Sequence, residues 1–136
     1  MRAILTALVL VLVAVPAGAQ SELEFNLCRD KDADLSIRGC TALIQKGVNR
    51  PEIYQKRGFA NFEKGRYRDA IADFTKVLAL DPKYYTVYMA RGYSYEKNGQ
   101  RAEAIADYRK AVKLNPASSP EAKASQTRLN VLTHTP

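Results

Sequence analysis

The sequence contains an internal repeat: residues 51–82 recur, with substitutions, as residues 85–116. Eleven of the 32 aligned pairs are identical, and Phe74 is matched by another aromatic residue, Tyr108. A fixed repeat interval of this length, from position 51 to position 85, is typical of stacked supersecondary units, which bury their apolar faces only against their neighbours. The repeat interval therefore predicts a short solenoid.

Each unit has the pattern of a helix hairpin. Aromatic, small and apolar residues recur at the spacing i, i+4, i+7 in both halves of the unit, which is the period of an amphipathic helix. Gly65 and Gly99 stand where a left-handed residue ends the first helix at no steric cost. Pro82 and Pro116 follow the second run and stop the second helix. We therefore expect two antiparallel helices per unit.

The small, aromatic and proline positions of both units carry a signature. Its members are Tyr54, Gly58, Ala70, Phe74, Pro82, Tyr88, Gly92, Tyr95, Ala104, Tyr108, Ala111 and Pro116. This pattern resembles the tetratricopeptide repeat family, from which Asn61 and Val77 depart, and Arg57 and Arg91 replace its usual leucine. The resemblance implies an all-α fold, a short right-handed solenoid of antiparallel helix hairpins with a C-terminal capping helix.

The same repeat interval continues toward the N-terminus with a weaker match, in which Cys40 aligns with Phe74. We expect a degenerate first hairpin there, with helices at residues 22–29 and 34–46. At the other end, Ser119 and a following proline are typical of a helix start, which predicts the capping helix. The expected parts are a signal peptide, 1–19, and one domain, 20–136, that comprises a degenerate hairpin, 20–50, two repeats, 51–84 and 85–118, and the capping helix with a tail, 119–136.

The N-terminus has the composition of a secretory leader. Arg2 precedes an apolar run over residues 4–15, and Ala17 and Ala19 supply small residues before a cut ahead of Gln20. The run is shorter than the ~20 residues that a spanning helix needs. We therefore expect an exported bacterial protein, periplasmic or extracellular, that does not span a membrane after leader removal.

Cys28 and Cys40 are the only cysteines, and they lie at equal distances on either side of Asp34, near a polar, turn-like stretch. Residues equally far from a turn face each other in an antiparallel helix pair, and export permits disulfides. We expect a disulfide. Two buried thiols and a reactive or metal-binding pair are the alternatives, and the only histidine, His134, is expected in a solvated tail.

Two charge pairs recur with the repeat. Arg57 and Asp73, and again Arg91 and Asp107, stand on opposite helices of one expected hairpin, at comparable distances from its turn. This placement predicts an ion pair within or between hairpins, and the alternative is two solvated charges. An exposed pair would contribute no more than ~1 kcal/mol.

No known arrangement of catalytic residues stands out in the sequence. It has no Ser/His/Asp or Cys/His arrangement, no metalloprotease or phosphate-binding motif and one histidine, so we expect no enzyme, catalytic residue, cofactor or metal site. The formal net charge is +7, which is compatible with an acidic partner through long-range attraction. The basic residues are spread over the chain and export is expected, so nucleic-acid binding is not.

A second stripe on the first helix of each unit predicts a binding groove. It is offset from the core stripe and consists of Gln55, Phe59, Phe62, Met89, Tyr93 and Glu96. Aromatic residues and methionine beside charges suit peptide recognition. Alternatively, Phe59 and Tyr93 pack between neighbouring hairpins.

The resemblance implies a protein or peptide ligand. Some relatives capture acidic carboxyl termini with Lys, Asn and Arg, but the matching places here hold Gln55, Phe59 and Ala90, so that role is not expected. We expect a non-catalytic adaptor of the cell envelope that binds a protein segment. The alternative is a structural or assembly protein that self-associates through the solenoid ends, because two full units are fewer than the three usually needed for stability.

Overall fold

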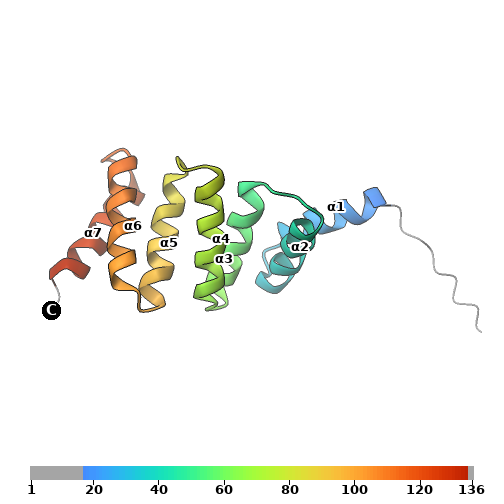
Figure 1. Ribbon diagram of the computed structural model, residues 1–136, viewed down its shortest axis with the longest axis horizontal. Helices are drawn as coiled ribbons and strands as arrows, with labels where there is room; N and C mark the ends of the chain where they lie inside the picture. The colour runs from blue at the N-terminus through green and yellow to red at the C-terminus, as the bar shows by residue number, and fades with distance from the viewer. Residues whose placement is uncertain (1–16, 135–136) are drawn as a thin grey trace, which may run out of the picture.

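The computed structural model describes residues 17–134, which form seven helices and no strand (Figure 1). The helices are α1 (Ala17–Cys28), α2 (Ala33–Gln45), α3 (Pro51–Glu63), α4 (Tyr67–Leu80), α5 (Tyr85–Lys97), α6 (Arg101–Leu114) and α7 (Pro120–His134). None of these helices is long and apolar enough to cross a membrane. The predicted leader, residues 1–19, lies outside the described residues except for its last three.

The helices pair into three consecutive hairpins, α1–α2, α3–α4 and α5–α6, and α7 packs against α6 (Figure 1). Each hairpin also packs on the next, through α2 with α3 and α4 with α5. The elements form a row from α1 to α7. The predicted all-α solenoid of helix hairpins is confirmed.

The turns between paired helices end where the sequence predicts. Gly65 and Gly99 follow α3 and α5 with φ angles of 71° and 79°, in the left-handed region. At the far end of each unit, Asp81 and Asn115 adopt extended backbone before the prolines. A residue before proline is driven out of the helical region by the proline ring, so α4 and α6 end there.

The buried core of the second and third hairpins is built from the signature residues. Phe74, Ala104 and Tyr108 are fully buried. A Cβ atom added at Gly58 would lie 2.8 Å from the Phe74 ring, and one at Gly92 would lie 3.1 Å from the Tyr108 ring. The glycines therefore let the two helices of each hairpin approach around a buried ring.

The first hairpin differs from its expected bounds. The first helix was predicted over residues 22–29, but α1 spans 12 residues, from Ala17 to Cys28. The second helix begins at Ala33 rather than residue 34. Asp32 caps it, because its carboxylate accepts a hydrogen bond from the Leu35 amide at 2.9 Å.

The C-terminal helix starts as predicted and runs further. The Ser119 hydroxyl accepts a hydrogen bond from the Ala122 amide at 3.0 Å, which caps the first turn of α7. The helix continues through His134, which was predicted in a tail and instead is the exposed last residue of α7. Its Nδ1 atom lies 2.9 Å from the Asn130 carbonyl oxygen, within the last helical turn.

Candidate functional site

One apolar pocket of about 660 Å³ opens between α3, α5 and α7. Its lining residues are Phe59, Phe62, Phe74, Thr86, Met89, Ala90, Tyr93, Glu121, Ala124, Thr127 and Arg128. Four of the six predicted groove residues are among them: Phe59, Phe62, Met89 and Tyr93. The other two, Gln55 and Glu96, do not line it.

The aromatic residues of the pocket both pack and remain accessible. The Phe59 ring lies 5.1 Å from the Phe74 ring in an edge-on arrangement, yet 47% of Phe59 is exposed. Phe62 of α3 lies 5.5 Å from Tyr93 of α5, so these rings join neighbouring hairpins. Phe59 contacts its own hairpin, whereas Tyr93 combines packing between hairpins with 36% exposure.

Arg128 of α7 closes one side of the pocket. Its guanidinium lies 5.7 Å from the centre of the Tyr93 ring, and its Nε atom donates a hydrogen bond to Glu96 Oε2 at 3.1 Å. A second guanidinium nitrogen forms an ion pair with Glu96 Oε1. The only cation that lines the pocket within the described chain is thus already paired.

Glu96 is held from a second side by Tyr108. The Tyr108 hydroxyl donates to Glu96 Oε2 at 2.9 Å. Burial raises the pKa of Tyr108 well above its ordinary value, so this hydroxyl keeps its proton and stays a donor. Glu96 therefore joins the buried ring of the third hairpin to α7.

The part of the pocket that α7 contributes was missed from the sequence, which predicts α7 only as a cap. A signal for it was present. Ala124 and Thr127 follow Ala90 and Tyr93 by one repeat interval. The repeat therefore continues into α7, and the face of α7 that carries Ala124 and Thr127 corresponds to the face of α5 that lines the pocket.

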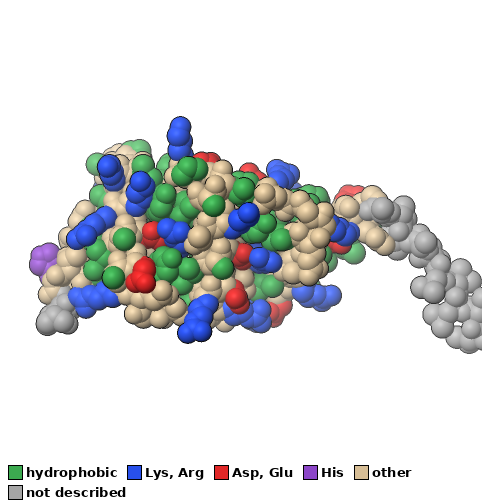
Figure 2. Space-filling view, in the orientation of Figure 1, with side chains coloured by type: hydrophobic (Ala, Val, Ile, Leu, Met, Phe, Trp, Pro, Cys, Tyr) green, Lys and Arg blue, Asp and Glu red, His purple; other side chains and the backbone are tan. Residues whose placement is uncertain are grey.

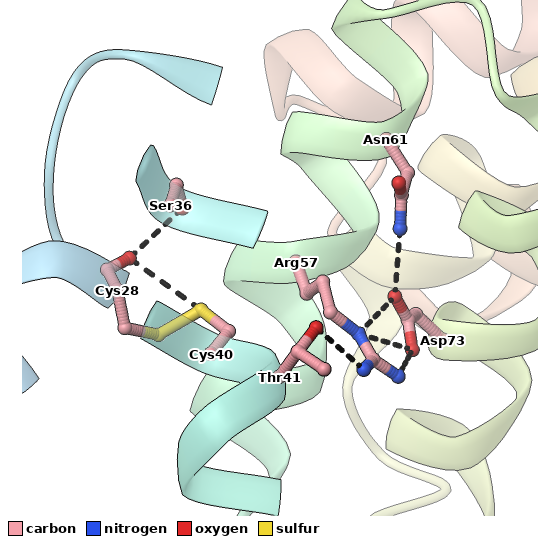
Figure 3. The surroundings of a disulfide bond; sticks show 7 residues. All are labelled: Cys28, Ser36, Cys40, Thr41, Arg57, Asn61 and Asp73. Carbon is pink, nitrogen blue, oxygen red and sulfur yellow. Dashed lines mark hydrogen bonds and ion pairs between the residues drawn. A yellow bond between two sulfur atoms is a disulfide. The ribbon is translucent and has the colours of Figure 1, made fainter. Parts of the chain in front are cut away.

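The two recurring charge pairs lie within their hairpins and reach the preceding one. Figure 3 shows the first of them, Arg57 with Asp73. The Arg57 guanidinium donates to both carboxylate oxygens of Asp73, at 2.7–3.2 Å, and to the Thr41 hydroxyl of α2 at 3.1 Å. Asn61, one of the departures from the family pattern, also donates to Asp73 at 3.2 Å. The hydrogen bond with Asp73 raises the pKa of Arg57.

Arg91 repeats this arrangement in the third hairpin. It donates to Asp107 at 2.7 and 2.9 Å and to the Thr75 hydroxyl of α4 at 3.0 Å. Only 8% of the Asp107 side chain is exposed. The upper bound of ~1 kcal/mol for the stabilisation by an exposed ion pair therefore does not apply to this pair. A hydrogen bond to a charged group contributes about 1.5–3 kcal/mol. The threonines were not among the predicted pairs, although Thr41 and Thr75 too are separated by one repeat interval.

The two cysteines form a disulfide between α1 and α2 (Figure 3). Cys28 and Cys40 are both buried, with their Cα atoms 4.5 Å apart. The Cys28 carbonyl oxygen accepts a hydrogen bond from the Ser36 hydroxyl at 2.9 Å. Of the three interpretations open from the sequence, the structure contains the disulfide. The described residues hold no group of three metal-ligating side chains.

The positive charge of the chain is dispersed. On the face drawn in Figure 2, Lys and Arg side chains are distributed along the length of the molecule and do not gather in one patch. Several cations already lie against aromatic rings or carboxylates, as Lys64 does with Asp34 at 2.8 Å. The surface therefore offers no concentrated basic site on that face.

Comparison with known proteins shows which proteins this chain is similar to. Residues 58–119 match the model of the tetratricopeptide repeat family. The structure is similar to the Arabidopsis OM64 TPR domain, with a TM-score of 0.70 and 26% identity, over 84% of this chain and 93% of that one. Both findings support the family resemblance over residues 58–119. No curated protein sequence matches the chain.

Two further solved structures share the fold. PcrH in complex with the chaperone binding region of PopD aligns with a TM-score of 0.72 at 18% identity, over 85% of this chain and 90% of that one. The first TPR of Spaghetti (RPAP3), bound to the HSP90 peptide SRMEEVD, aligns with a TM-score of 0.70 at 21% identity, over 85% and 88%.

Proposed function

We propose that this protein is a non-catalytic adaptor of the cell envelope that binds a protein segment in the pocket between α3, α5 and α7. The observation that carries the proposal is the gathering of Phe59, Phe62, Met89 and Tyr93 in one open apolar pocket. Aromatic residues and methionine are enriched in protein interfaces, and an exposed apolar patch marks an interaction site.

The solved structures named above agree with a binding role. PcrH is in complex with a region of PopD, and the first TPR of Spaghetti is bound to an HSP90 peptide. Solenoids of helix hairpins present an extended surface that serves for binding. The same architecture in this chain therefore supports binding of a polypeptide.

A double variant tests the binding role. The Phe59→Ala, Tyr93→Ala protein should lose the partners that the wild-type protein captures in a pull-down from its own cell envelope, with an unchanged circular dichroism spectrum. Tyr85→Ala is the matched control, because Tyr85 is 40% exposed and does not line the pocket. If the folded double variant retains every partner, the pocket is not the binding site.

The envelope location is supported by the leader composition and by the disulfide. Disulfides persist in oxidising compartments and are rare in the cytosol. Cell fractionation with N-terminal sequencing tests it, and a chain that begins at Gln20 outside the cytoplasm is expected. An intact Met1 in the cytosolic fraction would contradict the proposal.

Self-association through the solenoid ends stays the alternative. It was the alternative because the sequence shows only two full repeats, and in the structure the predicted degenerate hairpin, α1 with α2, packs on them as a third unit. The chain therefore has the three units that a stable solenoid usually needs. Size-exclusion chromatography with light scattering tests this alternative, and a monomer at all concentrations would remove it.

A further inference from the structure

The size of the pocket and the charges around it indicate which kind of segment it accepts. This inference rests on the proposed function, since it specifies the ligand of the same site. The pocket volume of about 660 Å³ is roughly four times the ~150 Å³ cavity that holds a benzene ring. Several ring-sized or branched side chains of one segment therefore fit together.

The charges around the pocket oppose an acidic ligand. Among the described residues that line the pocket, one is acidic, Glu121, and one is basic, Arg128. Arg128 is neutralised by Glu96 through an ion pair and a 3.1 Å hydrogen bond. A carboxylate that enters here would meet a guanidinium whose charge Glu96 already balances.

Glu96 is not easily displaced. Its Oε2 atom accepts from Arg128 Nε at 3.1 Å and from the Tyr108 hydroxyl at 2.9 Å, and only 17% of its side chain is exposed. Tyr108 is itself fully buried in the core of the third hairpin. Opening the ion pair would leave a shielded carboxylate with one partner fewer, which costs free energy.

Besides Arg128, Lys97 is a second cation close to the ring of Tyr93. Its amine lies 5.5 Å from the centre of the Tyr93 ring, but Lys97 does not line the pocket. A single exposed lysine holds a carboxylate weakly. It does not offset the negative charge of Glu121, which is one of the lining residues.

We infer that the pocket accepts an uncharged segment carrying bulky apolar side chains, and that Glu96 determines this preference by neutralising Arg128. Glu96 acts as a specificity-determining residue without lining the pocket. Removing its charge while keeping its shape leaves Arg128 as an unpaired cation beside Tyr93. The variant pocket then attracts a carboxylate that the wild-type pocket rejects.

Fluorescence anisotropy with three labelled synthetic peptides of equal length tests the inference on the purified protein. The first carries Leu and Phe between Gly-Ser flanks, the second has Ser in their place, and the third has Glu in their place with a free carboxyl terminus. The wild-type protein should bind the first about tenfold more tightly than either of the others, the expected gain from burying one large apolar side chain.

Glu96→Gln should raise the affinity for the acidic peptide about fivefold, the effect of one additional exposed charge pair. Glutamine still accepts a hydrogen bond from Tyr108, so the fold should persist. Glu103→Gln is the control, because Glu103 is exposed on α6 and makes the same change in net charge. The double variant Glu96→Gln, Arg128→Gln should lose the gain, since the freed cation is gone.

Three outcomes overturn the inference: equal wild-type affinity for the acidic and apolar peptides, identical behaviour of Glu96→Gln and Glu103→Gln, and binding of none of the peptides. The proposed function fails separately, through the partner pull-down. If the Phe59→Ala, Tyr93→Ala protein loses its partners while the wild-type protein prefers the acidic peptide, the pocket binds a protein segment and only the assigned chemistry is wrong.

Discussion

The first hairpin and the two that follow make the same contact between their helices by different chemistry. Cys28 and Cys40 form a disulfide between α1 and α2. In the second hairpin the matching positions hold Phe62 and Phe74, and Phe62 packs against the buried cluster that contains Phe74. In the third, the Tyr108 hydroxyl donates to Glu96. The hairpin geometry therefore constrains where this contact lies, and not which interaction forms it.

The first hairpin also lacks an ion pair that the other two share. The Arg–Asp ion pair of the second and third hairpins has no counterpart in the first, where Leu23 and Gly39 occupy the matching positions. A Cβ atom at Gly39 would collide with the backbone nitrogen of Cys28. Gly39 thus lets α1 and α2 come together closely, and the first hairpin has a disulfide at other positions in place of an Arg–Asp ion pair.

Of the changes that test this comparison, removing the disulfide should lower the stability of the protein most. Cys28→Ala, Cys40→Ala should lower the free energy of unfolding by about 3 kcal/mol, the loss expected for a short closed loop. Urea unfolding measures the change, and hydrogen exchange should show lost protection in α1 and α2 while α5 and α6 keep theirs. Wild-type protein with reductant is the control and should match the variant. Unchanged stability would show that packing alone holds the first hairpin.

Substituting the close-approach glycine should come next. Gly39→Ala should cost about 1–3 kcal/mol because the added methyl group meets backbone that must shift. Gly92→Ala is the matched variant in the third hairpin, where the new atom would lie 3.1 Å from the Tyr108 ring and a smaller loss is expected. Thermal unfolding compares them. A larger loss for Gly92→Ala would contradict the closer helix approach in the first hairpin.

Deleting the hydrogen bond of the third hairpin should have a smaller effect. Tyr108→Phe should lower stability by about 1 kcal/mol, because Glu96 keeps its partner Arg128 and the buried ring remains. Urea unfolding is the measurement, with Tyr85→Phe as the control on an exposed ring. If Tyr108→Phe lost more stability than Cys28→Ala, Cys40→Ala, the hydrogen bond of the third hairpin would contribute more than the disulfide of the first, contrary to the prediction.

The smallest effect concerns the junction between the two regions. The hydrogen bond from Lys64 of the second hairpin to Asp34 of the first lowers the pKa of that carboxyl from its ordinary value of 3.8. This contribution to stability is present above the ordinary pKa and is lost as the pH falls through the lowered one. In Lys64→Met, NMR measurements across the acidic range should show the Asp34 pKa returning toward the ordinary value. An unchanged pKa would mean that the pair is absent in solution.

The sequence alone determined the repeating architecture. The repeat interval, Gly65 and Gly99 at the turns and the prolines after α4 and α6 locate every hairpin end of the two full repeats. These features act through local backbone conformation, which depends on few neighbours. The aromatic stripe on the first helices was also visible, because helical periodicity alone places Phe59 and Tyr93 on one face.

Only the tertiary structure decided which partners these residues meet. The contact of Arg57 with Thr41, beyond its predicted partner Asp73, and the contact of Glu96 with Arg128 depend on how the hairpins and α7 stack. The same holds for the wall that α7 adds to the pocket. Periodicity specifies the face of a helix, whereas contacts between helices follow from the rotation and spacing of packed side chains, which sequence intervals do not contain.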